Sequence, residues 1–429
     1  MAVFSSPPWL IARAFAGWAV LAGVVGVLAG ISSAAFLLSL DAATAWRESH
    51  PWIIWFLPLG GLLIGLVYLR WGASVEGGNN LVLDEIHDPK KRLPLRMAPL
   101  ILVSTVATHL FGGSAGREGT AVQMGASLAD QLTRWLHLER HDRRILLMAG
   151  ISGGFAAVFG TPLAGMVFGL EVLAIGALRF EALFPCLVAA VVGDRVTVAL
   201  GVQHTVYTVA PVGAVTWAGG GSALLVGLAC GLTALAFAQV TRGISGFAKM
   251  RIPWMPLRLV VGGLLVVAGV LALGFSTRYL GLGIPVMVES FTHPLPAWDF
   301  ALKFLFTVIT LGFGFKGGEV TPLFCIGAAL GSAAAAVLPL PVDVLAGIGF
   351  VAVFAGAANT PLACIFMACE LFGVHLGVYA ALACIASYLV SGHAGIYKSQ
   401  QIAQAKHGVH PPEAIPSAPG AGAGAGNAG

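Results

Sequence analysis

Residues 161–171 read TPLAGMVFGLE, and residues 360–370 read TPLACIFMACE. In both stretches a glutamate follows the proline by nine positions, and about 200 residues separate the two. A second pair lies upstream in the same order, with GREGT at residues 116–120 and GGEVT at residues 317–321. Duplicated halves whose apolar segments are interrupted by glycine or proline are typical of transporters built from inverted repeats. The sequence therefore predicts two related halves of one membrane transporter.

Composition places the chain in a lipid bilayer. Of its 429 residues, 58% are hydrophobic and 10% are charged, whereas soluble domains carry about 25% charged residues. Several apolar stretches approach or exceed the roughly 20 residues that a membrane-crossing helix needs. They lie at residues 15–40, 52–69, 222–240, 257–275 and 377–390. We therefore predict an all-α polytopic membrane protein.

The same patterns divide the chain into four parts. Residues 1–14 are expected to form a cytoplasmic N-terminal segment, and no cleavable signal is evident there. Residues 15–205 and 206–405 are expected to form the first and second transmembrane repeats. Residues 406–429 turn into a Pro/Ala/Gly-rich sequence without apolar periodicity, which predicts a disordered tail.

Basic residues gather in short segments at 90–96, 140–144 and 242–251. Short basic loops usually remain in the cytoplasm, so segment 90–96 and the N-terminus, two spans apart, are both expected on that side of a cell membrane. No basic stretch is interleaved with aromatic residues, and we expect no nucleic-acid partner. The six cysteines lie in or beside apolar stretches, and no histidine shows ligand spacing. Neither a metal site nor a cofactor is expected.

Interrupted apolar segments have a direct chemical consequence. A helix that begins inside a membrane exposes unpaired backbone N–H groups, and lipid cannot satisfy them. The helix dipole adds positive potential at the same end. Several such ends that converge would bind an anion without any fixed cation.

The motifs resemble those of the CLC superfamily. Residues 113–125, GSAGREGTAVQMG, are similar to the family motif GxxxGREGPxVQxG, and residues 159–165, FGTPLAG, resemble the segment that ends in PLAG. Residues 314–318, GFKGG, resemble the second-half motif GxxGG, and Tyr397 follows Gly395-Ile396 where the family has a central tyrosine. The resemblance covers about residues 15–405. It implies a CLC-type fold, a homodimer with one pathway in each subunit, and re-entrant helix N-termini that form an anion site near the membrane midplane.

Departures from the family pattern favour its fluoride/proton antiporter branch. Thr120 replaces the usual proline after GREG, and residues 77–81, GGNNL, replace the GSGIP segment whose serine coordinates chloride. The Glu319-Val320 pair replaces the usual apolar pair. Val172 stands where chloride/proton exchangers carry a second, inward glutamate.

Glu118 is the first candidate functional residue. A carboxylate inside a membrane is costly and indicates function. The resemblance implies that Glu118 is the gate, which occupies the anion path when charged and leaves it when protonated. Glu319 is expected to receive or stabilise the protonated Glu118 side chain, with the Thr321 hydroxyl as a partner. The alternatives are that Glu118 pairs structurally with Arg117, and that Glu319 pairs with Lys316 or caps a helix.

Asn79 is a candidate for fluoride selectivity, because its amide offers two donors to a small, hard anion where a serine offers one. The alternative is that Asn79 or Asn80 caps the following helix. Tyr397 is expected to donate its phenolic O–H to the anion. By resemblance, the remaining anion-binding residues are Gly116, Arg117, Gly119, Val320 and Thr321. Glu171 and Glu370, at matching positions of the repeat, are expected to share a structural task.

The sequence thus predicts a transporter of the bacterial inner membrane that exports fluoride in exchange for protons. A CLC chloride/proton exchanger and a passive chloride channel remain as alternatives. Residues 150–154, GISGG, fit the GxSxG pattern of hydrolases, which would make Ser152 a nucleophile. Because no suitable His/Asp pair accompanies this pattern, an enzyme is the least favoured interpretation.

Overall fold

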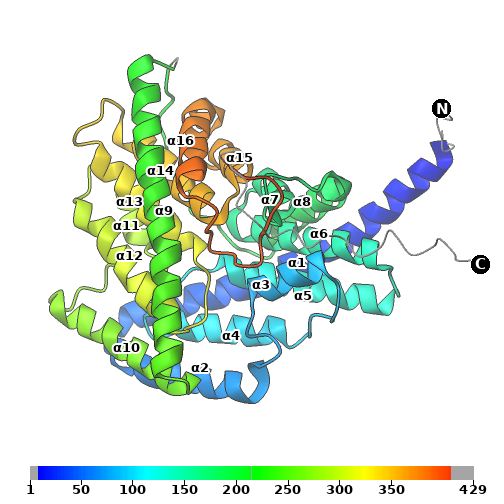
Figure 1. Ribbon diagram of the computed structural model, residues 1–429, viewed down its shortest axis with the longest axis horizontal. Coiled ribbons are helices and arrows are strands. Elements are labelled where there is room, and N and C mark those ends of the chain that lie inside the picture. The colour runs from blue at the N-terminus through cyan, green and yellow to red at the C-terminus, as the bar shows by residue number, and fades with distance from the viewer. Residues whose placement is uncertain (1–7, 214, 407–429) are drawn as a thin grey trace, which may run out of the picture.

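The computed structural model describes residues 8–213 and 215–406, and these residues are mostly helical (Figure 1). The first half contains α1 (Pro8–Ser49), η1 (Pro51–Phe56), α2 (Leu57–Val67), η2 (Tyr68–Gly72), α3 (Asn79–His87), α4 (Met97–Leu110), α5 (Glu118–Trp135), α6 (Arg140–Phe159), α7 (Pro162–Glu171), η3 (Phe180–Ala182) and α8 (Leu183–Ala199). The second half contains α9 (Trp217–Arg251), α10 (Met255–Ala272), α11 (Ile284–Glu289), α12 (Ala297–Gly312), α13 (Val320–Ala334), α14 (Val342–Ala358), α15 (Pro361–Phe372), η4 (Val374–Leu376) and α16 (Gly377–Val390).

Helix lengths confirm a multi-pass membrane protein. Among the described residues, five helical segments are long and apolar enough to cross a bilayer: Ile11–Ser49, Pro51–Gly72, Phe180–Ala199, Trp217–Arg251 and Met255–Ala272. The predicted crossing at 377–390 differs, because α16 belongs to the shorter apolar helices. These shorter helices do not cross the bilayer alone, so other parts of the protein must cover their ends.

The predicted N-terminal segment and C-terminal tail lie at the two ends of the described residues. Helix α1 begins at Pro8 and so extends into the predicted N-terminal segment at 1–14. In Figure 1 the start of this helix reaches away from the helical body. Of the predicted disordered tail at 406–429, all but Lys406 lies outside the described residues.

Matching contacts relate the two halves. Helix α5 packs along α6, and α13 packs along α14 in the same way. In the first pair Gly125 faces the carbonyl of Gly150 so closely that a methyl group would not fit, and in the second pair Gly327 faces Gly349 likewise. Small residues let membrane helices approach to this extent. The abundance of glycine within the apolar stretches therefore reflects helix packing in both halves.

Glu171 and Glu370 show that α7 and α15 are antiparallel neighbours. Each carboxylate lies at the C-terminal end of its own helix and accepts two backbone N–H groups at the start of the other helix. Leu163 and Ala164 donate to Glu370 at 2.9 and 2.8 Å, and Leu362 and Ala363 donate to Glu171 at 3.1 and 2.9 Å. Each glutamate thus caps the N-terminus of the neighbouring helix, which belongs to the other half of the chain. The expectation of a shared structural task for these two residues is confirmed.

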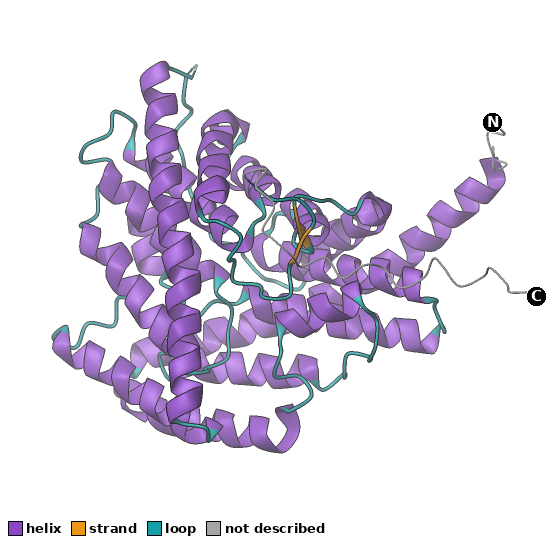
Figure 2. Cartoon of the chain, viewed as in Figure 1, coloured by secondary structure: helices purple, strands orange, loops and turns teal. Residues whose placement is uncertain are grey.

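The C-terminal segment returns to the first half after α16. Strand β2 (Gln401–Ile402) pairs in parallel with β1 (Ala174–Ile175), and Figure 2 shows this short pair among the helices. Asn80 accepts a hydrogen bond from the Ser399 amide at 3.1 Å. These contacts fix the segment that carries Tyr397 against the first half.

Candidate functional site

The starts of α5 and α13 meet where the two duplicated motifs pair. The Gly116 amide donates to the Gly318 carbonyl at 2.6 Å, and the Gly318 amide donates to the Gly116 carbonyl at 2.8 Å. This antiparallel bridge joins the GREGT and GGEVT loops directly. A Cβ atom on Gly116 would lie 3.0 Å from the Gly318 carbonyl oxygen, so the glycine permits this close approach.

The Glu118 side chain is fully buried between these two helix starts. Its Oε2 accepts the backbone N–H of Arg117 at 3.1 Å and that of Thr321 at 3.0 Å. Its Oε1 accepts a hydrogen bond from the Thr321 hydroxyl. The Arg117 Nε lies 3.7 Å from Oε1, farther than these donors. The carboxylate is therefore held chiefly by groups that could equally bind a small anion.

Val320 and Thr321 form the first turn of α13, and both are buried. On the first-half side, Thr120 shares a hydrogen bond with the Thr105 hydroxyl at 2.8 Å. The threonine that departs from the family pattern is thus tied to α4.

Asn79 lies against the start of α5. Its amide nitrogen is 2.8 Å from where a Cβ on Gly119 would stand, and its Oδ1 is buried without a hydrogen-bond partner. Gly78, not an asparagine, occupies the N-cap of α3, and no side chain caps that helix. The capping alternative is therefore wrong for both asparagines, since Asn80 instead binds Ser399.

Glu319 occupies the N-cap of α13 but makes no side-chain capping bond to it. Among the described residues, no ion pair joins Glu319 to Lys316 within 4.0 Å. Neither structural alternative for Glu319 is thus observed. Instead the residue lines a cavity of about 220 Å³ together with Asn79 and Tyr397. Ser74, next to the lining residue Val75, accepts a hydrogen bond at 2.7 Å from Arg96. Because Arg96 lies in the basic loop predicted to be cytoplasmic, we call this cavity the inner cavity.

Tyr397 is 7% exposed and lies beside Phe168, with ring centroids 6.4 Å apart. It lines the inner cavity and also a smaller apolar pocket beside Asn79 and Val172. Glu118, Asn79, Glu319 and Tyr397 thus approach one region from four separate segments. Asn79, Glu319 and Tyr397 share one cavity, and Gly119, next to Glu118, packs against Asn79.

Arg117 lies outside the inner cavity. It lines a small pocket with Thr321 and His204, in the loop between α8 and α9. Burial and the Arg117 charge lower the pKa of His204, although the nearby Asp194 raises it. The lowered pKa favours a neutral His204 ring, so the positive charge in this pocket comes from the Arg117 guanidinium.

The sequence analysis missed Lys303, which is fully buried under the GREGT loop. Its ammonium donates to the Ser114 hydroxyl at 2.9 Å and to the carbonyls of Gly281 and Tyr279 at 2.7 and 3.1 Å. A single lysine within the otherwise apolar run of α12 was the signal that could have revealed it. Lys303 anchors the first-half motif loop to the second half.

Ser152 lies in the middle of α6 rather than at a strand-to-helix turn. Its hydroxyl is buried without a hydrogen-bond partner, so no base activates it. The geometry of a nucleophile elbow is absent at residues 150–154, and the hydrolase interpretation has no support.

Comparison with known proteins identifies the family. A family model described as "Voltage gated chloride channel" matches residues 60–392. The chain is 58% identical over 405 residues to a protein of Pseudomonas syringae pv. tomato named "Chloride/fluoride channel protein", which covers 93% of this chain and 90% of that protein.

Solved structures show the same arrangement of helices. The crystal structure of a CLC-type fluoride/proton antiporter matches with a TM-score of 0.88 and 35% identity, over 93% of this chain and 100% of that one. A slow cyanobacterial Cl⁻/H⁺ antiporter matches with a TM-score of 0.78 and 19% identity, over 89% of this chain and 96% of that one. The second likeness concerns the fold alone.

Proposed function

We propose that this chain, which belongs to the CLC family of voltage gated chloride channels, exports cytoplasmic fluoride in exchange for protons. Family membership makes it an anion/proton transporter and a multi-pass membrane protein rather than an enzyme. The choice of fluoride, the roles of individual residues, a homodimer and a bacterial inner membrane are our proposals. The Pseudomonas relative supports the last of these.

The position of Glu118 carries the proposal. Its carboxylate occupies the meeting point of two helix N-termini and accepts donors from both halves. An anion that enters this position must displace the carboxylate. Protonation removes the negative charge of Glu118 and weakens its hold on these donors. One side chain thus competes with the anion and carries the proton, which couples the two fluxes.

The inward step of the proton is assigned to Glu319 and Thr321. The Thr321 hydroxyl already donates to Glu118, and Glu319 lies two positions earlier on the wall of the inner cavity. No acid stands at Val172, which is buried among apolar side chains. Glu319 therefore offers a carboxylate for the inner proton route where Val172 cannot.

Fluoride is favoured over chloride by the chemistry around Asn79. The Asn79 amide packs against the start of α5, where it could supply donors to a small anion, and Tyr397 lines the same cavity. Gly116, Arg117, Gly119, Val320 and Thr321 would contribute positive potential or backbone donors around the ion. Hydrogen fluoride enters cells as a neutral weak acid and ionises there, so exchange against protons would clear the trapped anion.

Reconstitution of the full chain into liposomes tests the proposal, with fluoride efflux and proton uptake followed together. Fluoride, but not chloride, should drive uphill proton movement, and Glu118→Gln should abolish it, since an amide cannot carry the proton. Equal driving by chloride would indicate a chloride/proton exchanger. Fluoride flux without proton movement would indicate a channel and refute the coupled mechanism.

A further inference from the structure

Two cations that the proposed exchange does not use lie at the inner cavity, one in its wall and one behind that wall. Lys316 lines its second-half wall, in the loop between α12 and α13. Arg258, near the start of α10, lies directly behind that wall. Its Nε would be 3.6 Å from a Cβ placed on Gly314, another residue of the lining. Both cations therefore lie on the side of the cavity that Gly314 and Lys316 line.

Neither cation has a carboxylate partner within 4.0 Å among the described residues. Arg258 is 5% exposed, and its Nε is buried without a hydrogen-bond partner. The Lys316 ammonium stands 4.0 Å from the centroid of the Tyr68 ring, and the Glu76 carboxylate acts on both cations only from beyond ion-pair distance. Burying unpaired cations is costly, and this cost points to an anion as the missing partner.

Two other buried cations among the described residues, Arg143 and Lys303, are compensated. Arg143 pairs with Asp130 at 2.7 Å and with Glu85 at 3.2 Å. Lys303 has three oxygen acceptors. Unlike Arg143 and Lys303, Lys316 and Arg258 have neither an ion pair nor a set of oxygen acceptors within the described part of the chain.

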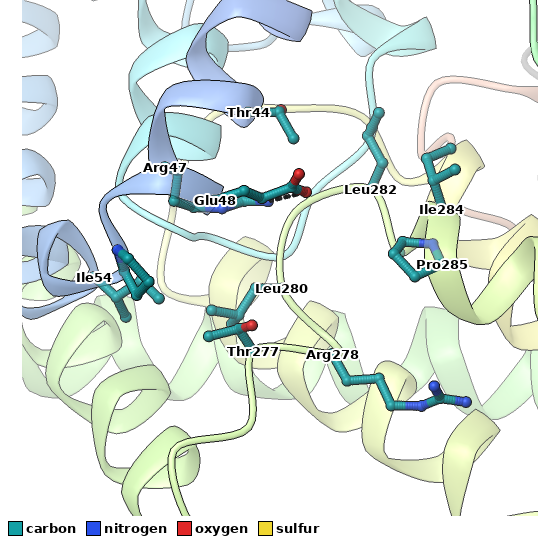
Figure 3. A pocket seen from close by; sticks show the side chains of 12 residues that line it. Thr44, Arg47, Glu48, Ile54, Thr277, Arg278, Leu280, Leu282, Ile284 and Pro285 are labelled. Atoms are coloured by element: carbon teal, nitrogen blue, oxygen red, sulfur yellow. Dashed lines mark ion pairs between the residues drawn. The ribbon is translucent and has the colours of Figure 1, made fainter.

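A second cavity, of about 240 Å³, provides a direct comparison (Figure 3). Its Arg47 donates to the His109 carbonyl at 2.8 Å and lies 3.8 Å from Glu48. Its Arg278 pairs with Glu289 and, at 3.0 Å, with Asp299. The cations of that cavity have carboxylate partners within 4.0 Å, whereas Lys316 and Arg258 have none among the described residues.

We infer that Lys316 and Arg258 form a capture site for small inorganic anions at the inner mouth of the pathway. The anion taken up is fluoride, an assignment that rests on the proposed function. The two charges raise the local anion concentration in the cavity, from which Asn79 and Tyr397 receive the ion. The capture site affects the uptake of the ion and leaves its exchange with Glu118 unchanged.

Glu76 opposes the two cations from the first-half wall. It lines the same cavity, is exposed to solvent, and forms no ion pair within 4.0 Å with Lys316 or Arg258. Its charge should repel anions from the mouth. Removal of this carboxylate is therefore expected to act in the opposite direction to removal of Lys316.

The test measures initial exchange rates in liposomes against fluoride concentration. Lys316→Gln should raise KM by about 3- to 10-fold with kcat nearly unchanged, and Lys316→Arg should restore the original KM. Glu76→Gln should lower KM, a gain that misfolding cannot produce. Lys90→Gln, which removes an exposed cation that pairs with Asp88 and does not line the cavity, is the matched control and should leave KM nearly unchanged. High ionic strength should reduce all these differences.

Reconstitution inserts the protein in both directions, so only the component that takes fluoride from the inner face should respond. An unchanged KM in Lys316→Gln, or a fall in kcat alone, would overturn the capture site while the proposed exchange stands. If the unmodified protein does not exchange fluoride for protons, the proposed function fails instead. The same variants are then measured with chloride, and an unshifted KM for chloride overturns the capture site as well.

Discussion

Replacing Glu171 with glutamine should destabilise the protein more than the same change at Glu370. Each carboxylate accepts two backbone N–H groups at the start of the helix from the other half. Glutamine retains one carbonyl oxygen, but its NH₂ group faces the second N–H as donor against donor. The substitution therefore removes one charge-assisted hydrogen bond and leaves one backbone N–H unsatisfied.

The surroundings set the size of the loss. A hydrogen bond to a charged group contributes about 1.5–3 kcal/mol, and a buried unsatisfied N–H costs about 1–3 kcal/mol. Glu171 is 7% exposed, so water replaces less of the lost bonding than at Glu370, and we expect a loss of about 2–4 kcal/mol. Glu370 is more exposed, so water can replace part of the lost bonding, and about 1–2 kcal/mol is expected there.

Unfolding in mixed micelles, followed by tryptophan fluorescence, measures both losses. Glu181→Gln, at an exposed carboxylate of η3, is the control and should not change the free energy of unfolding. Exchange at a temperature well below unfolding should persist in both cap variants, because neither glutamate lines the inner cavity or the small pocket beside Arg117. Equal losses at the two positions, or lost transport with unchanged stability, would refute the reasoning.

Three further substitutions test the ion pathway. Glu319→Gln should reduce the number of protons moved per fluoride, measured as simultaneous fluxes in liposomes, and unchanged coupling would contradict its proton role. Asn79→Ser offers one donor in place of two and should lower the preference for fluoride over chloride by about tenfold; equal selectivity in competition flux would contradict the assignment. Ser152→Ala should leave transport intact, since this hydroxyl has no hydrogen-bond partner; lost transport would show that the serine has an unrecognised role.

Local motifs made much of the site predictable. The positions of Glu118 and Thr321 follow from glycine-rich loops that end at helix starts, a pattern that short stretches of sequence contain. The matching positions of Glu171 and Glu370 likewise indicated a common role. In these cases the information lies within about ten residues, and the duplication repeats it.

Long-range contacts could not be predicted in the same way. The Gly116–Gly318 bridge joins residues from different halves, and Lys303 and Arg258 are single cations in apolar helices. Apolarity also failed to locate helix ends, because α1 continues to Ser49, past Asp41 and Arg47. Such residues are accommodated by tertiary partners that a hydropathy pattern does not contain.

The Gly116–Gly318 bridge has a mechanical consequence. Its two hydrogen bonds make the loops on either side of the ion position one continuous piece of backbone. A rocking motion of one half against the other would have to break both bonds in a buried place, where water cannot replace them. Motion confined to the torsion angles of the Glu118 side chain leaves the bridge intact. The bridge thus favours a transport cycle in which the Glu118 side chain rotates while the backbone on both sides of the ion position stays in place.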